Sequence, residues 1–362
     1  MRRLLYSDYE TIAKKYRDNI FKNLTKTHPL KNLDDLKKRI SPTPHNGYQK
    51  YIDYIDEIIK NFEDEKNPED LLLVKPSEVK RSWDNYKKSK SICANDFFGK
   101  HKALFLTQKE LEEAPWDDQN DKTQFNDAIV DALRYDYVRD SPYGFVSYFN
   151  DLNINACVYC NASYIVNTNI RGKTPGGKNR LEIMGRYELD HYLPKSQFPF
   201  LCVSFYNLQP SCPFCNRWKS IQDSDFNLYT DVKNDLDPFE FELNQNVITS
   251  LAIDKRENVR NILLNCKDQN LKTNHNDVFH IEDLYKSFDD EAEELLWLKD
   301  AQTHGYQQNI IAVFGKLFSK VGMSLSTDQI VRLLYRFYAN GDIHKRPLSK
   351  MRLDLAKKLK LY

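Results

Sequence analysis

Apolar and polar residues follow a helical period over much of the first 150 residues. One apolar stripe recurs at steps of three and four and consists of Tyr48, Tyr51, Ile52, Ile55, Ile58, Ile59 and Phe62. A second stripe consists of Phe125, Ile129, Leu133, Tyr137 and Val138. It stops where Ser141 precedes Pro142. Both stripes predict helices that pack an apolar face into a core, and neither carries residues arranged for chemistry.

The pattern changes in the rest of the chain. Short apolar runs alternate with Gly, Asn and Pro over 151–220. Residues 239–243 and 247–251 predict two strands joined by a short turn, and a helical period returns from about Glu257. We therefore predict a mainly α fold with three regions: a helical region 1–150, a small mixed unit 151–225, and a region 226–362 that holds a short β-hairpin followed by helices.

Composition favours a globular protein that stays in the cytoplasm. The chain has 362 residues, of which 41% are hydrophobic and 29% charged, so it can bury a core. Apolar runs such as 71–74 are far shorter than the roughly 18 residues that a membrane span needs. Arg2 and Arg3 are followed by hardly any apolar residues before Asp8, which argues against a secretory signal. We expect no membrane association and reduced thiols.

Charge is balanced overall but unevenly distributed. The formal net charge is +1, whereas 151–220 carry eight basic and four acidic residues. The last 18 residues hold seven basic side chains against Asp354 alone. A solvated helix face is the favoured interpretation of this basic tail. Contact with a phosphate backbone is the alternative.

Four of the seven cysteines form two close pairs. Cys157 and Cys160 are separated by two residues, as are Cys212 and Cys215, and 51 residues lie between the pairs. This spacing lets four thiolates surround one ion, which is the tetrahedral set that Zn²⁺ prefers. We predict a structural zinc ion that does no chemistry because all four of its positions are filled. The other cysteines are interpreted as ordinary buried thiols: Cys93, Cys202 and Cys266.

Between the cysteine pairs lies a cluster of acid, histidine and asparagine residues. Asp190 and His191 fall at the end of an expected strand, and Asn216 falls at the start of the helix after the second pair. Carboxylate and amide oxygens are hard ligands that suit Mg²⁺ or Mn²⁺. A neutral histidine beside such a metal can take a proton from water that attacks phosphorus. Strand period sends Asp190 and His191 to opposite faces, so both serve one site only if the strand bends or ends there.

This segment resembles the HNH, or ββα-metal, endonuclease family over roughly 150–225. The resemblance implies that helical flanks surround a small zinc-stapled ββα-metal unit. It assigns the role of general base to His191 and of metal ligands to Asp190 and Asn216. It implies that Asn207 braces the loop and orients the histidine.

The same resemblance extends to three further positions. Glu188 stands where some members have a supporting acid. Lys219 would lie one helical turn from Asn216 and could touch the scissile phosphate. Ser220 replaces the further histidine ligand of some members, which favours a magnesium site with more bound water.

The resemblance implies hydrolysis of phosphodiester bonds in DNA, with RNA as the alternative substrate. The layout is also similar to nuclease subunits of bacterial anti-phage systems such as the Septu type, which work with an ATPase partner. A catalytically inactive nucleic-acid-binding or assembly module is the alternative from another class. Residues 172–179 match a nucleotide-binding glycine loop except at their last position, and we interpret them as a connection inside the unit.

Overall fold

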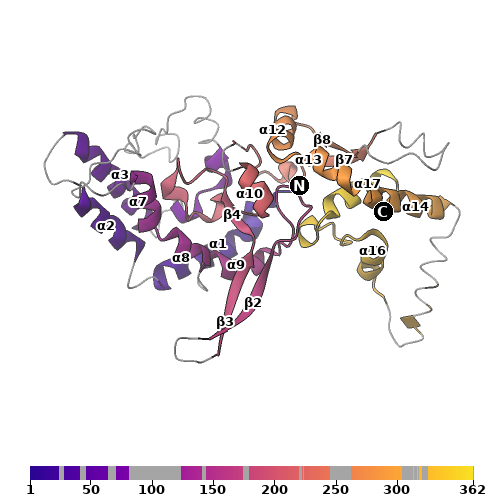
Figure 1. The fold of residues 1–362 in the computed structure, drawn as a ribbon, viewed down its shortest axis with the longest axis horizontal. Helices are drawn as coiled ribbons and strands as arrows, with labels where there is room; N and C mark the ends of the chain where they lie inside the picture. The colour runs from indigo at the N-terminus through magenta and orange to yellow at the C-terminus, as the bar shows by residue number, and fades with distance from the viewer. Residues whose placement is uncertain are drawn as a thin grey trace.

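The computed structural model describes most of the chain and is mainly helical (Figure 1). The described residues are 1–23, 28–40, 46–63, 71–80, 124–140, 144–173, 179–219, 222, 224–244, 262–303, 313, 316, 318–319 and 325–361. Its α-helices before the cysteine pairs are α1 (Tyr6–Asn23), α2 (Pro29–Arg39), α3 (Asn46–Glu63), α7 (Phe125–Ala132), α8 (Tyr135–Asp140) and α9 (Phe145–Leu152). The prediction of a mainly α protein is therefore confirmed.

The two apolar stripes differ in how they fold. The first forms α3, whose side chains at Tyr51, Ile55 and Ile58 are buried as expected. The second is not one helix, because the chain breaks between α7 and α8 at Arg134, which has a left-handed φ of 59°. The restart after this break points Tyr135 toward the centre of the molecule, where its hydroxyl donates to the carbonyl of Leu189 at 3.1 Å.

Strands appear only in pairs within the described residues. Antiparallel pairs join β2 (Val166–Lys173) to β3 (Asn179–Arg186) and β4 (Glu188–His191) to β5 (Leu208–Ser211), and helix α10 (Pro213–Lys219) follows β5. A parallel pair joins β1 (Leu4–Leu5) to β6 (Tyr229–Thr230). The backbone on either side of the glycine loop 174–178 is thus a β-hairpin, which does not fit a nucleotide-binding loop, because that loop leads from a strand into a helix.

The hairpin prediction for the last region is confirmed in its first strand only. Residues 239–243 form β7, but β7 pairs with β8 (Ile262–Cys266). The predicted strand 247–251 lies outside the described residues. The predicted return of helix from about Glu257 is wrong over β8, where buried residues Ile262, Leu264 and Cys266 alternate with exposed ones. The helices after β8 are α12 (Gln269–Phe279), α13 (Ile281–Tyr285), α14 (Asp289–Thr303), α16 (Thr327–Tyr335) and α17 (Ser349–Lys358).

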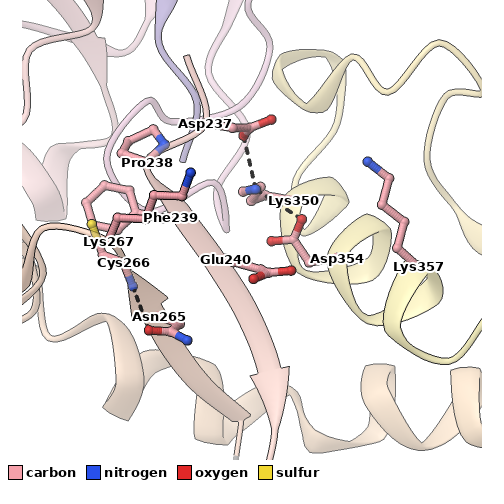
Figure 2. Close-up of a pocket in the computed structure, with 10 residues that line it drawn as sticks. All are labelled: Asp237, Pro238, Phe239, Glu240, Asn265, Cys266, Lys267, Lys350, Asp354 and Lys357. Atoms are coloured by element: carbon pink, nitrogen blue, oxygen red, sulfur yellow. Dashed lines mark hydrogen bonds and ion pairs between the residues drawn. The ribbon is translucent and has the colours of Figure 1, made fainter. Parts of the chain in front are cut away.

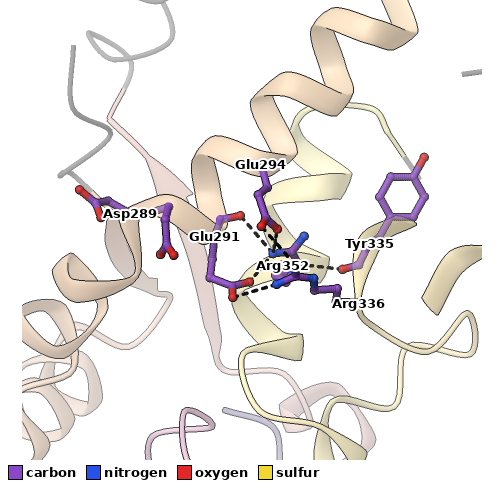
Figure 3. A network of polar contacts seen from close by, with 7 residues as sticks. Asp289, Glu291, Glu294, Tyr335, Arg336 and Arg352 are labelled. Carbon is purple, nitrogen blue, oxygen red and sulfur yellow. Dashed lines mark hydrogen bonds and ion pairs between the residues drawn. The ribbon is translucent and has the colours of Figure 1, made fainter. Parts of the chain in front are cut away.

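The basic tail is buried in part. Its interpretation as a solvated helix face is wrong for Lys350 and Arg352, whereas Lys357, Lys358 and Lys360 are exposed. Arg352 of α17 is 1% exposed and its guanidinium contacts Glu291 and Glu294 of α14, the latter at 3.1 Å (Figure 3). Lys350 is also buried, with its ammonium 3.0 Å from carboxylate oxygens of both Asp237 and Asp354 (Figure 2). These cations can be buried because carboxylates of α14, of Asp237 and of α17 itself neutralise them.

One hydrophobic core cluster runs through all three predicted regions. It includes Ile55 from the first region, Phe205 from the second and Tyr285 from the third. The division at residues 150 and 225 itself stays a prediction. Among the helices of the described residues, none combines the length and apolar character needed to cross a membrane.

Candidate metal and catalytic site

Four buried cysteines gather in the middle of the molecule. Their sulfur atoms lie within 4.8 Å of one another, although the two pairs come from distant parts of the chain. Cys157 and Cys160 lie in the turn after α9, while Cys212 directly follows β5 and Cys215 lies in α10. This cluster could bind a metal such as Zn²⁺, as the spacing of the pairs predicts.

The surroundings of the sulfurs fit a bound cation. The amide of Cys212 donates to Sγ of Cys157 at 3.3 Å, and the amide of Ala162 donates to Sγ of Cys160 at 3.4 Å. Burial raises the pKa of the Cys157 thiol well above its usual value. Four thiolates this close together repel one another, and a divalent cation removes that repulsion. The second pair also sets the start of α10, because the amide of Asn216 donates to the carbonyl of Cys212 at 3.1 Å.

Asp190 is the centre of a buried polar network. Its Oδ2 atom accepts a hydrogen bond from the hydroxyl of Tyr159 and lies 3.0 Å from the ammonium of Lys219. The Tyr159 hydroxyl in turn accepts from Nε2 of Gln209 at 2.9 Å. Gln209 is fixed by the amide of Leu228, which donates to its Oε1 at 2.6 Å. All donors converge on Oδ2, so among the described residues none binds Oδ1 of Asp190.

Lys219 points into the protein instead of toward solvent. Its side chain is 4% exposed, and besides Asp190 it donates to the backbone carbonyl of His191 at 2.5 Å. The sequence suggested a contact with the scissile phosphate, whereas the structure places this ammonium on the expected metal ligand. Lys219 therefore acts as the counter-ion of Asp190 in this structure.

His191 is buried on the opposite side of the strand from Asp190. Its Nε2 atom lies 2.9 Å from the carbonyl oxygen of Cys202, and its ring packs 4.9 Å from that of Tyr135. A carbonyl can only accept, so Nε2 carries the hydrogen and Nδ1 keeps its lone pair in the neutral ring. Burial lowers the pKa of His191 to about 4, which keeps the imidazole neutral at pH 7.

Asn207 holds the loop that follows His191. Its Oδ1 accepts from the amide of Leu193 at 2.7 Å, and its Nδ2 donates to the carbonyls of Leu193 at 3.1 Å and Leu201 at 3.2 Å. The side chain is completely buried. None of these hydrogen bonds reaches the imidazole of His191. Asn207 fixes the loop from which the neighbouring carbonyl of Cys202 reaches His191, so its effect on the histidine is indirect.

The remaining two predicted residues lie nearer the surface. Asn216 is half-buried and stands three residues before Lys219, which places it on the face of α10 that meets Asp190. Glu188 is exposed at the start of β4 and lines a cavity of about 220 Å³ with Arg139 and Tyr187. Strand period puts Glu188 on the same side of β4 as Asp190. The structure thus brings together Asp190, Lys219 and the backbone of His191. Glu188 lies at the exposed edge of this cluster.

Two residues of this network were not predicted from the sequence. Tyr159 lies between the first two cysteines, and Gln209 lies in β5 opposite Asp190 in the strand register. The position of Tyr159 inside a cysteine turn was the available signal, because such a turn fixes the side chains that it contains. Gln209 carried no such signal, since its partners Tyr159 and Leu228 are remote in sequence.

Comparisons with known proteins give one partial similarity. The chain is 35% identical over 75 residues to the Septu protein PtuB of Bacillus thuringiensis. This match covers 20% of the present chain and 23% of that protein, so the chain spans about a quarter of the length of the relative. No protein-family model matches the chain, and no solved structure matches it.

Proposed function

We propose that the protein is a metal-dependent HNH endonuclease that hydrolyses phosphodiester bonds in DNA. The observation that carries the proposal is the arrangement of β4, β5 and α10 on the four-cysteine cluster, with a neutral His191 and an Asp190 whose Oδ1 has no partner among the described residues. The cluster would hold a structural Zn²⁺. Oδ1 of Asp190 and the amide oxygen of Asn216 would hold Mg²⁺ or Mn²⁺.

The chain's own groups fit the steps of hydrolysis. Nδ1 of His191 accepts a proton from the water that attacks phosphorus, because the Cys202 carbonyl fixes the hydrogen on Nε2. His191 and Asp190 lie on opposite sides of β4, so this step requires that the substrate lie across the end of the strand, which is at His191. The bond from phosphorus to the 3′ oxygen breaks, and the departing 3′ oxygen takes a proton from solvent water, which leaves a 5′-phosphate and a 3′-hydroxyl. Asn207 keeps the loop that carries the Cys202 carbonyl in place. A divalent cation, when bound, supplies positive charge against the charge that builds on the phosphate.

A role in antiviral defence is the biological part of the proposal. It is supported by the partial similarity to the Septu protein PtuB. We propose that the protein acts in the cytoplasm as the nuclease subunit of a defence complex and that an ATPase subunit is its partner.

The contact between Lys219 and Asp190 favours a second candidate function. An ammonium already neutralises the carboxylate that a metal would use, which is the arrangement expected of a nucleic-acid-binding or assembly module with an inactive site. The nuclease proposal requires that the divalent cation bind at Oδ1 beside this ammonium.

A cleavage assay decides between the two candidates. Purified protein is incubated with duplex DNA, single-stranded DNA and RNA in Mg²⁺ or Mn²⁺, alone and with a co-expressed ATPase partner. We expect the wild type to cut duplex DNA, and His191→Ala to lose at least a hundredfold in rate with unchanged zinc content. His280→Asn is the matched control, because His280 is exposed at the end of α12 with a φ of 49° that Asn tolerates. Equal rates for wild type and His191→Ala would remove the nuclease proposal.

A further inference from the structure

The β2–β3 hairpin forms a ribbon that stands away from the rest of the molecule. The two strands pair over eight residues each, from Val166 opposite Arg186 to Lys173 opposite Asn179, and they form a sheet of their own. Figure 1 shows the ribbon extending beyond the helices around it. Eight residues of strand reach about 26 Å.

The ribbon is anchored at its base only. Asn167 donates from Nδ2 to the carbonyl of Val146 in α9 at 2.8 Å, and the ring of Tyr187 stacks on Phe149 with centroids 4.2 Å apart. Gly185 makes room for this stack, because a Cβ atom there would lie 2.7 Å from the Tyr187 ring. The core cluster contains Ile165 and Leu189 on either side, but no described residue of the two strands. The contacts at the base therefore fix the direction of the ribbon, which adds little to the core. The ribbon depends on these contacts because a two-stranded sheet is only marginally stable by itself.

Half of the eight basic residues in 151–220 lie on the two strands of this ribbon. Its strands carry Arg171, Lys173, Arg180 and Arg186, against the single acid Glu182. Arg171 and Arg186 are exposed, and neither has an ion pair in the part of the chain that the structure describes. The register places Arg171 on one face of the ribbon and Arg186 on the other. A ribbon with cations on both faces suits a groove with phosphates on both sides better than a flat anionic surface.

The shape of the ribbon selects among nucleic acids. The major groove of B-form DNA is about 12 Å wide and admits a two-stranded β-ribbon. The major groove of duplex RNA is deep and narrow, so side chains on a ribbon cannot enter it. The base of the ribbon is also continuous with the candidate site, because β3 ends at Arg186 and β4 begins at Glu188.

We propose that the β2–β3 ribbon is a docking arm that enters the major groove of duplex DNA and holds the duplex beside β4. The choice of DNA as the substrate rests on the proposed nuclease function, whereas the docking itself does not require cleavage. Arg171 and Arg186 contact the phosphates that line the groove.

Binding measured without cleavage tests the arm. A labelled 30-base-pair DNA duplex is titrated with the full chain in EDTA-free buffer containing Ca²⁺ and no Mg²⁺, with fluorescence anisotropy recorded over a series of salt concentrations. We expect the double variant Arg171→Gln/Arg186→Gln to bind roughly 10- to 30-fold more weakly near 0.15 M salt, with a salt slope shallower by about 2. The matched control is Lys15→Gln/Lys31→Gln, which removes the same charge from exposed positions on α1 and α2 and should change the affinity less than twofold.

Three results would overturn the docking arm. One is absence of wild-type binding to the DNA duplex, and another is an arm variant that binds like the control. The third is an equal loss of affinity for an RNA duplex of the same sequence, which would point to a general cation effect. Failure of the nuclease proposal is seen separately, because a wild-type protein that binds the duplex in Ca²⁺ but does not cut it in Mg²⁺ would remove the nuclease and leave the docking arm.

Discussion

Two lysine–aspartate pairs are buried in the part of the chain that the structure describes, and they are completed in different ways. In the C-terminal region, both oxygens of Asp354 are used, since Oδ1 meets Lys350 at 3.0 Å and Oδ2 accepts from the amide of Phe241 at 2.9 Å. In the central unit, Tyr159 and Lys219 both bind Oδ2 of Asp190. The Oδ1 atom of Asp190 has no partner within the described residues.

This difference separates a structural carboxylate from a candidate ligand. A buried carboxylate that uses every acceptor stabilises the fold and offers nothing to a further cation. A buried carboxylate with one occupied and one open oxygen keeps its orientation and can still bind. Burial and charge pairing by themselves would not distinguish the two aspartates, whereas the use of each oxygen does.

Removal of a sulfur ligand should have the largest effect on stability, and it should unfold the central unit. Cys215→Ser takes away one of four ligands of the proposed zinc site, and such sites contribute on the order of 10 kcal/mol to folding. We expect loss of bound zinc by elemental analysis and loss of cooperative unfolding by circular dichroism. Cys266→Ser is the control, because Cys266 is buried outside the cluster. A folded Cys215→Ser protein without zinc would contradict the structural role.

Breaking the Lys350–Asp354 pair, in which both carboxylate oxygens have partners, should reduce stability without changing metal binding. Asp354→Asn leaves the ammonium of Lys350 buried with only Asp237 opposite, which should lower the free energy of unfolding by about 3 to 5 kcal/mol. The double variant Lys350→Met/Asp354→Asn should recover most of this loss in urea unfolding. Mg²⁺ should raise the melting temperature of Asp354→Asn as it does for the wild type, and should fail to do so for Asp190→Asn. An equal response of both variants to Mg²⁺ would mean that Asp190 is no more a metal ligand than Asp354 is.

Acid should lower the free energy of unfolding through two buried histidines that lie outside both lysine–aspartate pairs. Burial lowers the pKa of His275 and of His344 to about 3, below the ordinary value of 6.5. The unfolded chain therefore takes up two more protons at these histidines than the folded one between pH 6.5 and 3, and His191, with its pKa of about 4, adds a third over most of that window. Together they should make stability fall with decreasing pH by up to about 4 kcal/mol per pH unit. Urea unfolding at several pH values checks this, and His344→Gln should reduce the slope by about a third.

Removing Lys219, the counter-ion of Asp190, should strengthen metal binding. Lys219→Met deletes a positive charge 3.0 Å from Asp190, so the affinity for Mg²⁺ measured by calorimetry without DNA should rise about tenfold, or about 1.4 kcal/mol. Lys350→Met deletes a similar buried ammonium beside Asp354 and should leave the affinity for Mg²⁺ unchanged. Weaker Mg²⁺ binding by Lys219→Met would mean that the ammonium is needed to orient Asp190.

The cysteine pairs and the first apolar stripe were predictable because their signals are local. A spacing of two residues between thiols and a repeat of three to four residues both describe neighbours along the chain. The single helix expected for Phe125–Val138 failed because Arg134 turns left-handed there and directs the Tyr135 hydroxyl to Leu189. That requirement comes from a strand more than fifty residues away.

The partners of the candidate site were less accessible to sequence reasoning. Tyr159, Asp190, Gln209 and Lys219 meet because three elements and a cysteine turn converge, and no short pattern records that convergence. The prediction for the basic tail failed at Lys350 and Arg352 for the same reason. Their charges predict exposure when α17 is considered alone, yet their partners Glu291, Glu294 and Asp237 lie far upstream.

The carbonyl of His344 accepts hydrogen bonds from the amides of Asn155, at 2.7 Å, and Ala156, at 2.9 Å, just before the first cysteine pair. During synthesis on the ribosome, these amides emerge about 189 residues before their acceptor. At 5–20 residues per second, the delay is roughly 10 to 40 s. The first cysteine turn must therefore persist through that time with its backbone incomplete. Translation speed in the second half of the chain thus sets how long the nascent cysteines stay open to the wrong ion or to oxidation.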